Sequence, residues 1–461
     1  MRTSFSFSRV WFTLSLVVLA FLYGTGVGKW GWFPHSFLDR AMNQARTVLP
    51  QTILPIDKPK PHFLHPRTYS REGVQTLKID RMETGLTLIS SSWKEYGGGL
   101  RLINSRGEVL HQWRVNPAEI SSQSSDIASY ALENFAGPHG THLFPNGDVI
   151  VNVKRRAGLA RLNACGDLIW SLPSSTGDWW AHHSVDRAEN GSFWVGGARM
   201  TKPDWKGLQR FEEVREELIV KVSPNGKVLR KISVLDLVWR NGLQRGVLKQ
   251  FENTLDNEDI THLNDIEELS SSMASQYPLF EKGDLVVSLR RPDLVFVFDP
   301  SSMEVKWKAS DPFINQHDPD FIGDGWIGVF DNRQDFTSRG KLLGGSRILA
   351  VQPHTDSTKV LFPTPSSDTF YTPWGGKWQK LDNGNLLITE ARAGRVLEVA
   401  PNGRTVWEWV HASWRRESSK DPQVPEVYEG TRYDLTREKI ASWPCSSVDS
   451  ASTSNQPTSV Q

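Results

Sequence analysis

Residues 315–332 read NQHDPDFIGDGWIGVFDN, and this stretch contains the pattern that decides the fold. His317 stands eight positions before the turn glycine Gly325, and an apolar segment follows the turn. The same spacing recurs in two further pairs, His139 with Gly147 and His183 with Gly191. A fourth copy opens at His262, and in a fifth the equivalent position is Gly376. The chain is therefore built from an internal repeat that returns a histidine to one position.

The repeat unit is clearest at 376–410, where two Asn-Gly turns separate short apolar segments. Asn383-Gly384 and Asn402-Gly403 each stand between such segments, which is the strongest short-range signal for a β-hairpin. Four antiparallel strands in each unit, repeated along the chain, are typical of a β-propeller blade. We count six such units, at about 74–116, 139–172, 182–233, 262–309, 317–362 and 376–411. The sequence predicts an all-β, six-bladed propeller, with a partly helical insertion at about 234–260.

Composition narrows the class of protein. The 461 residues include 53 Lys and Arg against 52 Asp and Glu, a net charge of +1, so we expect no nucleic-acid partner. The two cysteines, Cys165 and Cys445, are too few for a disulfide framework and lack the spacing of metal ligands. A bond between them is possible, but two unpaired thiols are at least as good an interpretation.

The N-terminus predicts a transmembrane helix. Residues 10–28 are uncharged and mostly apolar, which is long enough to cross a bilayer. Arg2 and Arg9 precede this segment, so the positive-inside rule places the rest of the chain on the extracytoplasmic side. A cleaved signal peptide is the alternative, but no clear cleavage site follows the apolar segment, and we favour an uncleaved anchor.

These patterns divide the chain into four parts. They are an anchor at 1–32, a proline-rich linker at 33–73, the propeller at 74–413 and a partly disordered C-terminal extension at 414–461.

The histidines of the repeat indicate a site on the propeller axis. The first strand of each blade lines the central channel, so residues at one position of that strand converge. Four blades carry a histidine there: His139, His183, His262 and His317. A polar channel lining inherited by repetition is the simpler explanation for any single histidine. Four in register favour a functional site, because crowded polar groups are rarely placed for stability.

Two other residue types support an anion site beside these histidines. Arg290 ends a strand of the fourth unit, and an arginine among imidazoles stabilises an oxyanion. Asn264 follows His262 by two positions, so both side chains share one face of a regular strand and Asn264 has an amide to donate. We expect the neighbouring Arg291 to be a surface residue that pairs with Asp293.

These motifs resemble those of the bacterial arylsulfotransferases, which use an aryl sulfate rather than a nucleotide sulfate as donor. Over residues 74–411 the chain carries that family's motifs in order. They are His182-His183, His262-Leu263-Asn264, Ser288-Leu289-Arg290, Gln316-His317-Asp318 and Phe330-Asp331-Asn332.

The resemblance implies a periplasmic propeller that transfers a sulfuryl group from an aryl sulfate to a phenol through a sulfohistidine. It makes His317 the nucleophile, with His262, Arg290 and His183 assisting catalysis. It also implies that Asn264 binds the sulfate oxygens, and we add His139 and His182 as substrate-binding residues. No cofactor or metal is expected, and the partners are small aryl sulfates and phenols, together with the membrane.

Two alternatives belong to other classes of function. A membrane-tethered propeller that binds a ligand or protein without catalysis would retain the same histidines as channel lining. A metalloenzyme would use three or four imidazoles as ligands. Arg290 argues against the metal, because a guanidinium beside the cluster repels a cation.

Overall fold

We describe the fold from a computed structural model of the 461-residue chain. The structure describes residues 7–30, 63–95, 97–121, 137–153, 157–173, 179–250, 259–414 and 422–445. The chain divides into two units, Met1–Lys60 and Pro61–Gln461, which are considered separately.

In the first unit, the described residues form one helix, α1 (Phe7–Trp30), which covers the predicted span. Its described side chains include large apolar groups that are mostly exposed, such as Phe12 at 67% and Phe21 at 73%. Among the described residues of the chain, however, no helix is both long enough and apolar enough to cross a membrane. The predicted transmembrane helix is therefore unconfirmed.

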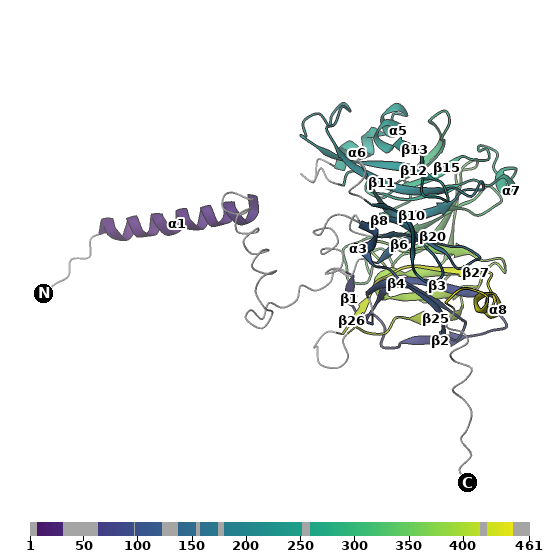
Figure 1. Cartoon of the computed structure of the whole chain (residues 1–461). Helices are drawn as coiled ribbons and strands as arrows, with labels where there is room; N and C mark the ends of the chain where they lie inside the picture. Colours follow the sequence, from purple (N-terminus) through teal and green to yellow (C-terminus); the bar gives the residue numbers. More distant parts are fainter. Residues whose placement is uncertain are drawn as a thin grey trace, which may run out of the picture. The chain divides into compact units, whose positions relative to one another are not determined.

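The second unit is a six-bladed propeller (Figure 1), as the repeats predicted. Each blade is an antiparallel sheet, and four of the blades are formed by strands that are consecutive in the chain. The second blade contains β6 (Pro138–Leu143), β7 (Val149–Val153), β8 (Gly158–Leu162) and β9 (Leu168–Pro173). The third contains β10 (Trp180–Arg187), β11 (Phe193–Thr201), β12 (Val214–Val222) and β13 (Val228–Ser233). The fourth contains β14 (Leu263–Glu268), β15 (Leu285–Leu289), β16 (Leu294–Asp299) and β17 (Glu304–Ala309). The fifth contains β18 (His317–Phe321), β19 (Ile327–Asp331), β20 (Arg347–Gln352) and β21 (Ser357–Phe362).

The remaining two blades combine strands from both ends of the chain and so close the ring. The first blade runs in the order β27 (Val427–Tyr433), β3 (Leu86–Trp93), β4 (Gly97–Ile103) and β5 (Val109–Arg114). The sixth runs β22 (Trp378–Lys380), β23 (Leu386–Glu390), β24 (Arg395–Val399), β25 (Thr405–Val410) and β2 (Gly73–Leu77). Outside the blades, β1 (Leu64–Pro66) pairs with β26 (Gln423–Pro425).

This closure corrects three predicted boundaries. The propeller does not end at 413, because Val427–Tyr433 forms the innermost strand of the first blade. Gly73–Leu77 is not the first strand of that blade but the outermost strand of the sixth. Leu64–Pro66, which we placed in the linker, pairs within the propeller unit. In each case the partner strand lies more than 300 residues away, so local patterns could not identify it. Residues 33–62 of the expected linker and the expected disordered tail, 446–461, lie outside the described residues.

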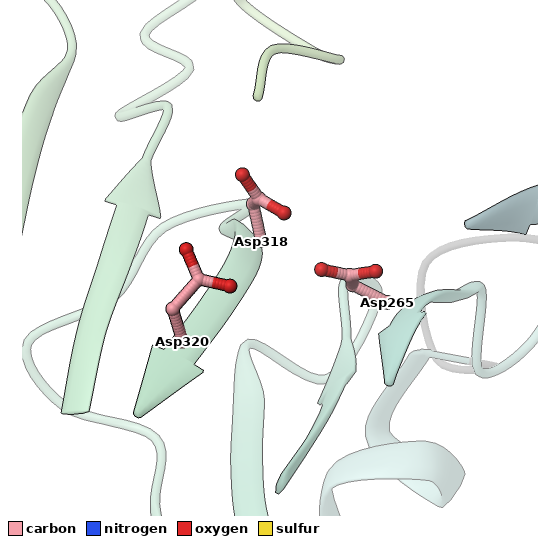
Figure 2. Close-up of side chains that lie close together, drawn as sticks. All are labelled: Asp265, Asp318 and Asp320. Atoms are coloured by element: carbon pink, nitrogen blue, oxygen red, sulfur yellow. The ribbon is translucent and has the colours of Figure 1, made fainter. Parts of the chain in front are cut away.

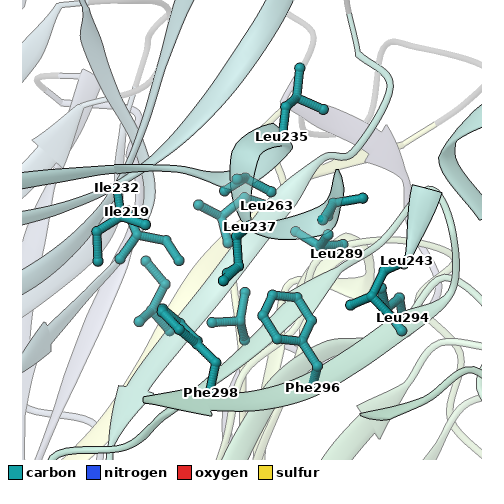
Figure 3. Packing of buried hydrophobic residues seen from close by; sticks show 14 of the residues in the cluster. Ile219, Ile232, Leu235, Leu237, Leu243, Leu263, Leu289, Leu294, Phe296 and Phe298 are labelled. Atoms are coloured by element: carbon teal, nitrogen blue, oxygen red, sulfur yellow. The ribbon is translucent and has the colours of Figure 1, made fainter. Parts of the chain in front are cut away.

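The insertion after the third blade is partly helical, as predicted. It forms α5 (Val234–Arg240), whose N-cap Ser233 accepts a hydrogen bond from the backbone N–H of Asp236, and α6 (Gln244–Gln250). Leu235 and Leu237 of α5 pack with side chains of the third and fourth blades, such as Ile219 and Phe296 (Figure 3). The helix therefore extends the apolar contact between two blades. Short helices elsewhere are α3 (Pro117–Ser121), α7 (Ser271–Ala274), η1 (Ala391–Ala393) and α8 (Arg437–Ala441).

Cys165 and Cys445 form a disulfide, which we had considered no more probable than two free thiols. The bond joins the second blade to the residues that follow the closing strand β27. A cross-link over 280 positions restricts the unfolded chain strongly. It therefore stabilises the closed ring and fits an oxidising compartment.

Candidate active site

The four repeat histidines lie where the innermost strands of their blades become irregular. His139 is in β6, His183 is in β10, His262 directly precedes β14, and His317 begins β18. The pairing of each strand with its neighbour shifts at or next to the histidine. His183 and His262 also have positive backbone φ angles, of 58° and 53°. Bulges and strained residues of this kind redirect side chains at functional sites.

The histidines meet, as their shared position predicted. The ring centroids of His139 and His183 are 4.5 Å apart, and those of His183 and His262 are 4.9 Å apart. His317 lines the same cavity as His139 and His183, together with Tyr428 of the closing strand. The cavity holds about 20 Å³, little more than one water molecule.

His317 is held as a neutral imidazole with its proton on Nδ1. Its Nε2 accepts a hydrogen bond from the Gly375 N–H (3.2 Å), so Nε2 carries the lone pair. Its Nδ1 lies 2.7 Å from the Asn332 side-chain oxygen and 3.1 Å from the Asn315 carbonyl, which both accept. The Asn332 amide donates to the carbonyls of Thr372 and Gly375, which fixes its oxygen toward the ring. Burial and the nearby Arg290 lower the pKa of His317 to about 3.

His262 is hydrogen-bonded to a residue that sequence reasoning missed. Its Nδ1 lies 2.5 Å from a carboxylate oxygen of Asp259. Burial and Arg290 lower the pKa of His262 to about 4, although Asp259 opposes this change. Burial would raise the pKa of Asp259, but His262 and Arg215 hold it below its usual range. The pair therefore combines a neutral imidazole with a carboxylate that stabilises it when it gains a proton.

Arg290 follows β15 and lies within the electrostatic reach of both His262 and His317. Its Nε is buried and has no hydrogen-bond partner within the described part of the chain. Burial lowers its pKa to about 10, and Asp259 opposes this, so the guanidinium is charged at neutral pH. A buried cationic donor without a partner is suited to an anionic ligand. Arg291 differs from our expectation, because it pairs with Asp259 (Nε–Oδ2 3.5 Å) and not with Asp293.

The other predicted binding residues occupy two different places. Asn264 lines the histidine cavity, where its amide donates to the Gln316 carbonyl (2.7 Å). Its Oδ1 and the Oγ of Ser184 are buried in this cavity without a partner among the described residues. His182 contacts the ring of His183 (centroids 5.0 Å apart), and its Nε2 lies 2.5 Å from Glu217. His182 is therefore placed to support His183 rather than to line the cavity.

The fifth copy has Gly376 in place of a histidine for a steric reason. Gly376 has a φ of +103°, and a Cβ atom there would come within 2.6 Å of the Phe330 ring. Only glycine fits such a position without displacing the ring. The neighbouring Gly375 also has a positive φ and supplies the N–H that contacts His317.

Three acidic side chains come together beside the histidine cavity, Asp318 and Asp320 of β18 and Asp265 of β14 (Figure 2), and Asp265 and Asp318 also line that cavity. Their oxygens come within 4.8 Å of one another. Lys377 donates to Asp318 and to Asp265 (3.4 Å). Burial raises the pKa of Asp318 and of Asp320 well above the usual range, although Lys377 opposes this. The three carboxyl groups can therefore lie close together because Lys377 supplies a positive charge and because burial favours the protonated, uncharged form of Asp318 and Asp320.

The acidic cluster also bears on the metalloenzyme alternative. Among the described residues, it is the one group of three or more potential metal ligands that come close together, and it contains no histidine. The geometry does not favour a metal held by the imidazoles.

A larger cavity of about 530 Å³ adjoins this site, and we call it the vestibule. Arg290 and Asn315 line it, and both also act on His317. Trp374 lines the vestibule, while the next residue, Gly375, lines the histidine cavity. One short segment thus contributes to both spaces, which places the vestibule beside the His317 ring.

Known proteins give the following matches. A model of the arylsulfotransferase (ASST) family matches residues 140–412, more than half of the chain. No curated protein matches. A solved protein of unknown function from Bacteroides caccae is similar, with 11% identity, a TM-score of 0.44, and coverage of 70% of this chain and 93% of that chain. TolB from Acinetobacter baumannii is also similar, with 10% identity, a TM-score of 0.40, and coverage of 75% of this chain and 66% of that chain.

Proposed function

Because the chain belongs to the arylsulfotransferase (ASST) family, we propose that it transfers a sulfuryl group from an aryl sulfate to a phenol through a sulfohistidine at His317. The hydrogen bonding of His317 is the observation that carries this proposal. Its Nδ1–H donates to a fixed acceptor, Asn332, and its Nε2 holds a lone pair beside the cationic Arg290. A neutral imidazole with a defined tautomer is a competent nucleophile.

In the first half-reaction, the Nε2 lone pair of His317 attacks sulfur. The N–S bond forms as the S–O bond to the aryl group breaks, and the phenolate leaves with the bonding electrons. The proton on Nδ1 stays on the ring. The Asn332 side-chain oxygen accepts a hydrogen bond from this N–H and so stabilises the positive charge that develops on the imidazole. Arg290 stabilises the negative charge on the sulfuryl oxygens. Gly375 N–H must release Nε2 for this step, since it donates to the same lone pair.

In the second half-reaction, the hydroxyl oxygen of the acceptor phenol attacks sulfur, and the S–N bond breaks with its electrons returning to Nε2. His262 takes the phenol proton, with Asp259 stabilising the imidazolium, and passes that proton to solvent. By microscopic reversibility, a His262 imidazolium that has taken its proton from solvent protonates a poorly leaving phenolate in the first step. His183, His139 and Asn264 line the site, and His182 supports it. This order of events predicts ping-pong kinetics.

The proposal is tested by incubating the purified protein with 4-nitrophenyl sulfate and phenol, and identifying the products by mass spectrometry. We expect nitrophenolate release that depends on phenol and yields phenyl sulfate in equal amount. If several aryl sulfates give no release, the proposal fails, and the propeller that only binds a ligand or protein becomes the better interpretation.

We expect the donor reaction to be insensitive to pH around the usual pKa of histidine. His317 must be neutral to attack, and its pKa is lowered to about 3, so it stays neutral from pH 7 to pH 5. Protonation removes the nucleophile only as the pH falls toward that lowered value. kcat/KM for 4-nitrophenyl sulfate, measured from pH 5 to pH 8, should show no acid-side decline centred near 6.5. A decline there would mean that the nucleophile has an ordinary pKa.

Asp259→Asn should slow the acceptor step selectively. It removes the carboxylate that stabilises the His262 imidazolium, and general acid–base catalysis contributes about 10²–10⁴-fold to rates. We expect kcat/KM for the acceptor phenol to fall roughly ten- to hundredfold. The donor kcat/KM for 4-nitrophenyl sulfate, whose leaving group needs little protonation, should change much less. Equal losses in both constants would contradict this role, and the exposed Asp382→Asn is the control.

We further propose that α1 anchors the chain in a membrane with the propeller on the extracytoplasmic side. The uncharged segment 10–28, the preceding Arg2 and Arg9, and the exposed apolar side chains of the helix support this. The expressed chain should stay in the membrane fraction after an alkaline carbonate wash, and a chain lacking residues 1–32 should not. Release of the full chain by the wash would contradict the anchor.

A further inference from the structure

The vestibule beside His317 has features that fold stability does not explain. Phe336 is 89% exposed on its lining and has a φ of +60°, a strained conformation that bulky residues rarely adopt. The loop around it is nevertheless well defined. Asp335 accepts hydrogen bonds from the backbone N–H groups of Thr337 (2.9 Å), Leu342 (2.8 Å) and Leu343 (3.0 Å). Hydrogen bonds therefore hold the backbone of this loop, and the strained backbone of Phe336 presents an apolar ring to solvent.

A second aromatic side chain lines the same space. Trp374 is 37% exposed, and the Arg392 guanidinium lies over its ring at 3.9 Å from the centroid. Arg392 is itself held by a hydrogen bond from its Nε to His65 (3.1 Å). The indole ring thus packs against the Arg392 guanidinium, which is itself held in place by its hydrogen bond to His65. Such rings bind flat aromatic groups by stacking.

The charges and size of the vestibule restrict the ligand further. Its ionisable lining residues are Arg290, Arg291 and Asp293, a net charge of +1 when all are ionised. This balances one sulfate monoester and disfavours a donor with several phosphates. A cavity of about 150 Å³ is enough for benzene, so about 530 Å³ accommodates more than one ring.

We propose that the vestibule selects planar aryl sulfates and phenols of two or more fused rings, with the ring system held by Trp374 and Phe336. This inference rests on the proposed function, because it assigns the aryl part of the substrate to a space beside His317. It makes Trp374 and Phe336 the residues that determine specificity.

Binding of arylsulfonates tests this without turnover, because their C–S bond does not transfer a sulfuryl group. Calorimetry on the full-length protein should give tighter binding of 2-naphthalenesulfonate than of benzenesulfonate, and weakest binding of hexanesulfonate. Trp374→Leu and Phe336→Ser should each weaken 2-naphthalenesulfonate binding about three- to tenfold, the value of one aromatic contact. The control is Leu342→Ser, a 75% exposed residue of the same loop outside the vestibule lining, and it should bind like the wild type.

Equal affinity for the three sulfonates, or undiminished binding in both variants, would overturn the inference. These outcomes are separate from failure of the proposed function. Selective sulfonate binding without any sulfuryl transfer would retain the aromatic site and refute the transferase. Transfer that is equally efficient with phenol and 2-naphthol would retain the transferase and refute the vestibule as its selector.

Discussion

His317→Ala should reduce sulfuryl transfer by at least about 10⁴-fold, the scale on which loss of a catalytic nucleophile acts. The variant lacks the Nε2 lone pair, which in the wild type is set by the Nδ1–H that donates to Asn332. Transfer from 4-nitrophenyl sulfate to phenol is the measurement. Donor binding should survive, because Arg290 is unchanged.

The control for this variant is His354→Ala, an exposed histidine in the same blade. It should transfer at the wild-type rate, and both variants should show the wild-type circular dichroism spectrum. His317→Asn provides a second test, because it keeps a polar side chain and removes less volume than the change to alanine. Wild-type-like turnover in either His317 variant would remove this residue from the mechanism.

Arg290→Ala should lower kcat/KM for the donor by about a hundredfold or more, the effect of losing one oxyanion donor. Arg290 lines the vestibule, and its buried Nε has no partner within the described residues, so it is available to a sulfuryl group whose charge grows in the transition state. Arg290→Lys should recover part of the rate, since it restores the charge but not the planar donor.

The loss in Arg290→Ala should appear in kcat as well as in KM, because the arginine stabilises the transition state more than the bound donor. The exposed Arg230→Ala on an outer strand is the control and should leave both constants unchanged. A rise in KM alone would make Arg290 a binding residue without a catalytic role.

The repeat made the fold and the meeting of the histidines predictable. Each of the histidines His139, His183, His262 and His317 precedes a turn within its own repeat. The blades could therefore be predicted from residues that are near one another in the sequence. The closing strand Val427–Tyr433 was not predictable in this way, because it lacks the repeat's turn and pairs with residues far away in the chain.

The residues that support the site were harder to find than those that line it. Asn332 lay in a motif we had recognised, but its role depends on carbonyls from the 372–375 segment. Asp259 lies three residues before His262 in an insertion, and the two are in contact where that histidine has a positive φ. Tyr428 belongs to the closing strand and was missed with it. Such contacts arise from tertiary structure, so no local signal shows them.

The most direct test of the account is the release of 4-nitrophenolate from 4-nitrophenyl sulfate without any acceptor, followed by rapid mixing. We predict a burst of one equivalent per protein molecule, with the sulfuryl group found on His317 by peptide mass spectrometry, and turnover only after phenol is added. Continuous release without an acceptor, or a burst with no modification of His317, would contradict transfer through a sulfohistidine.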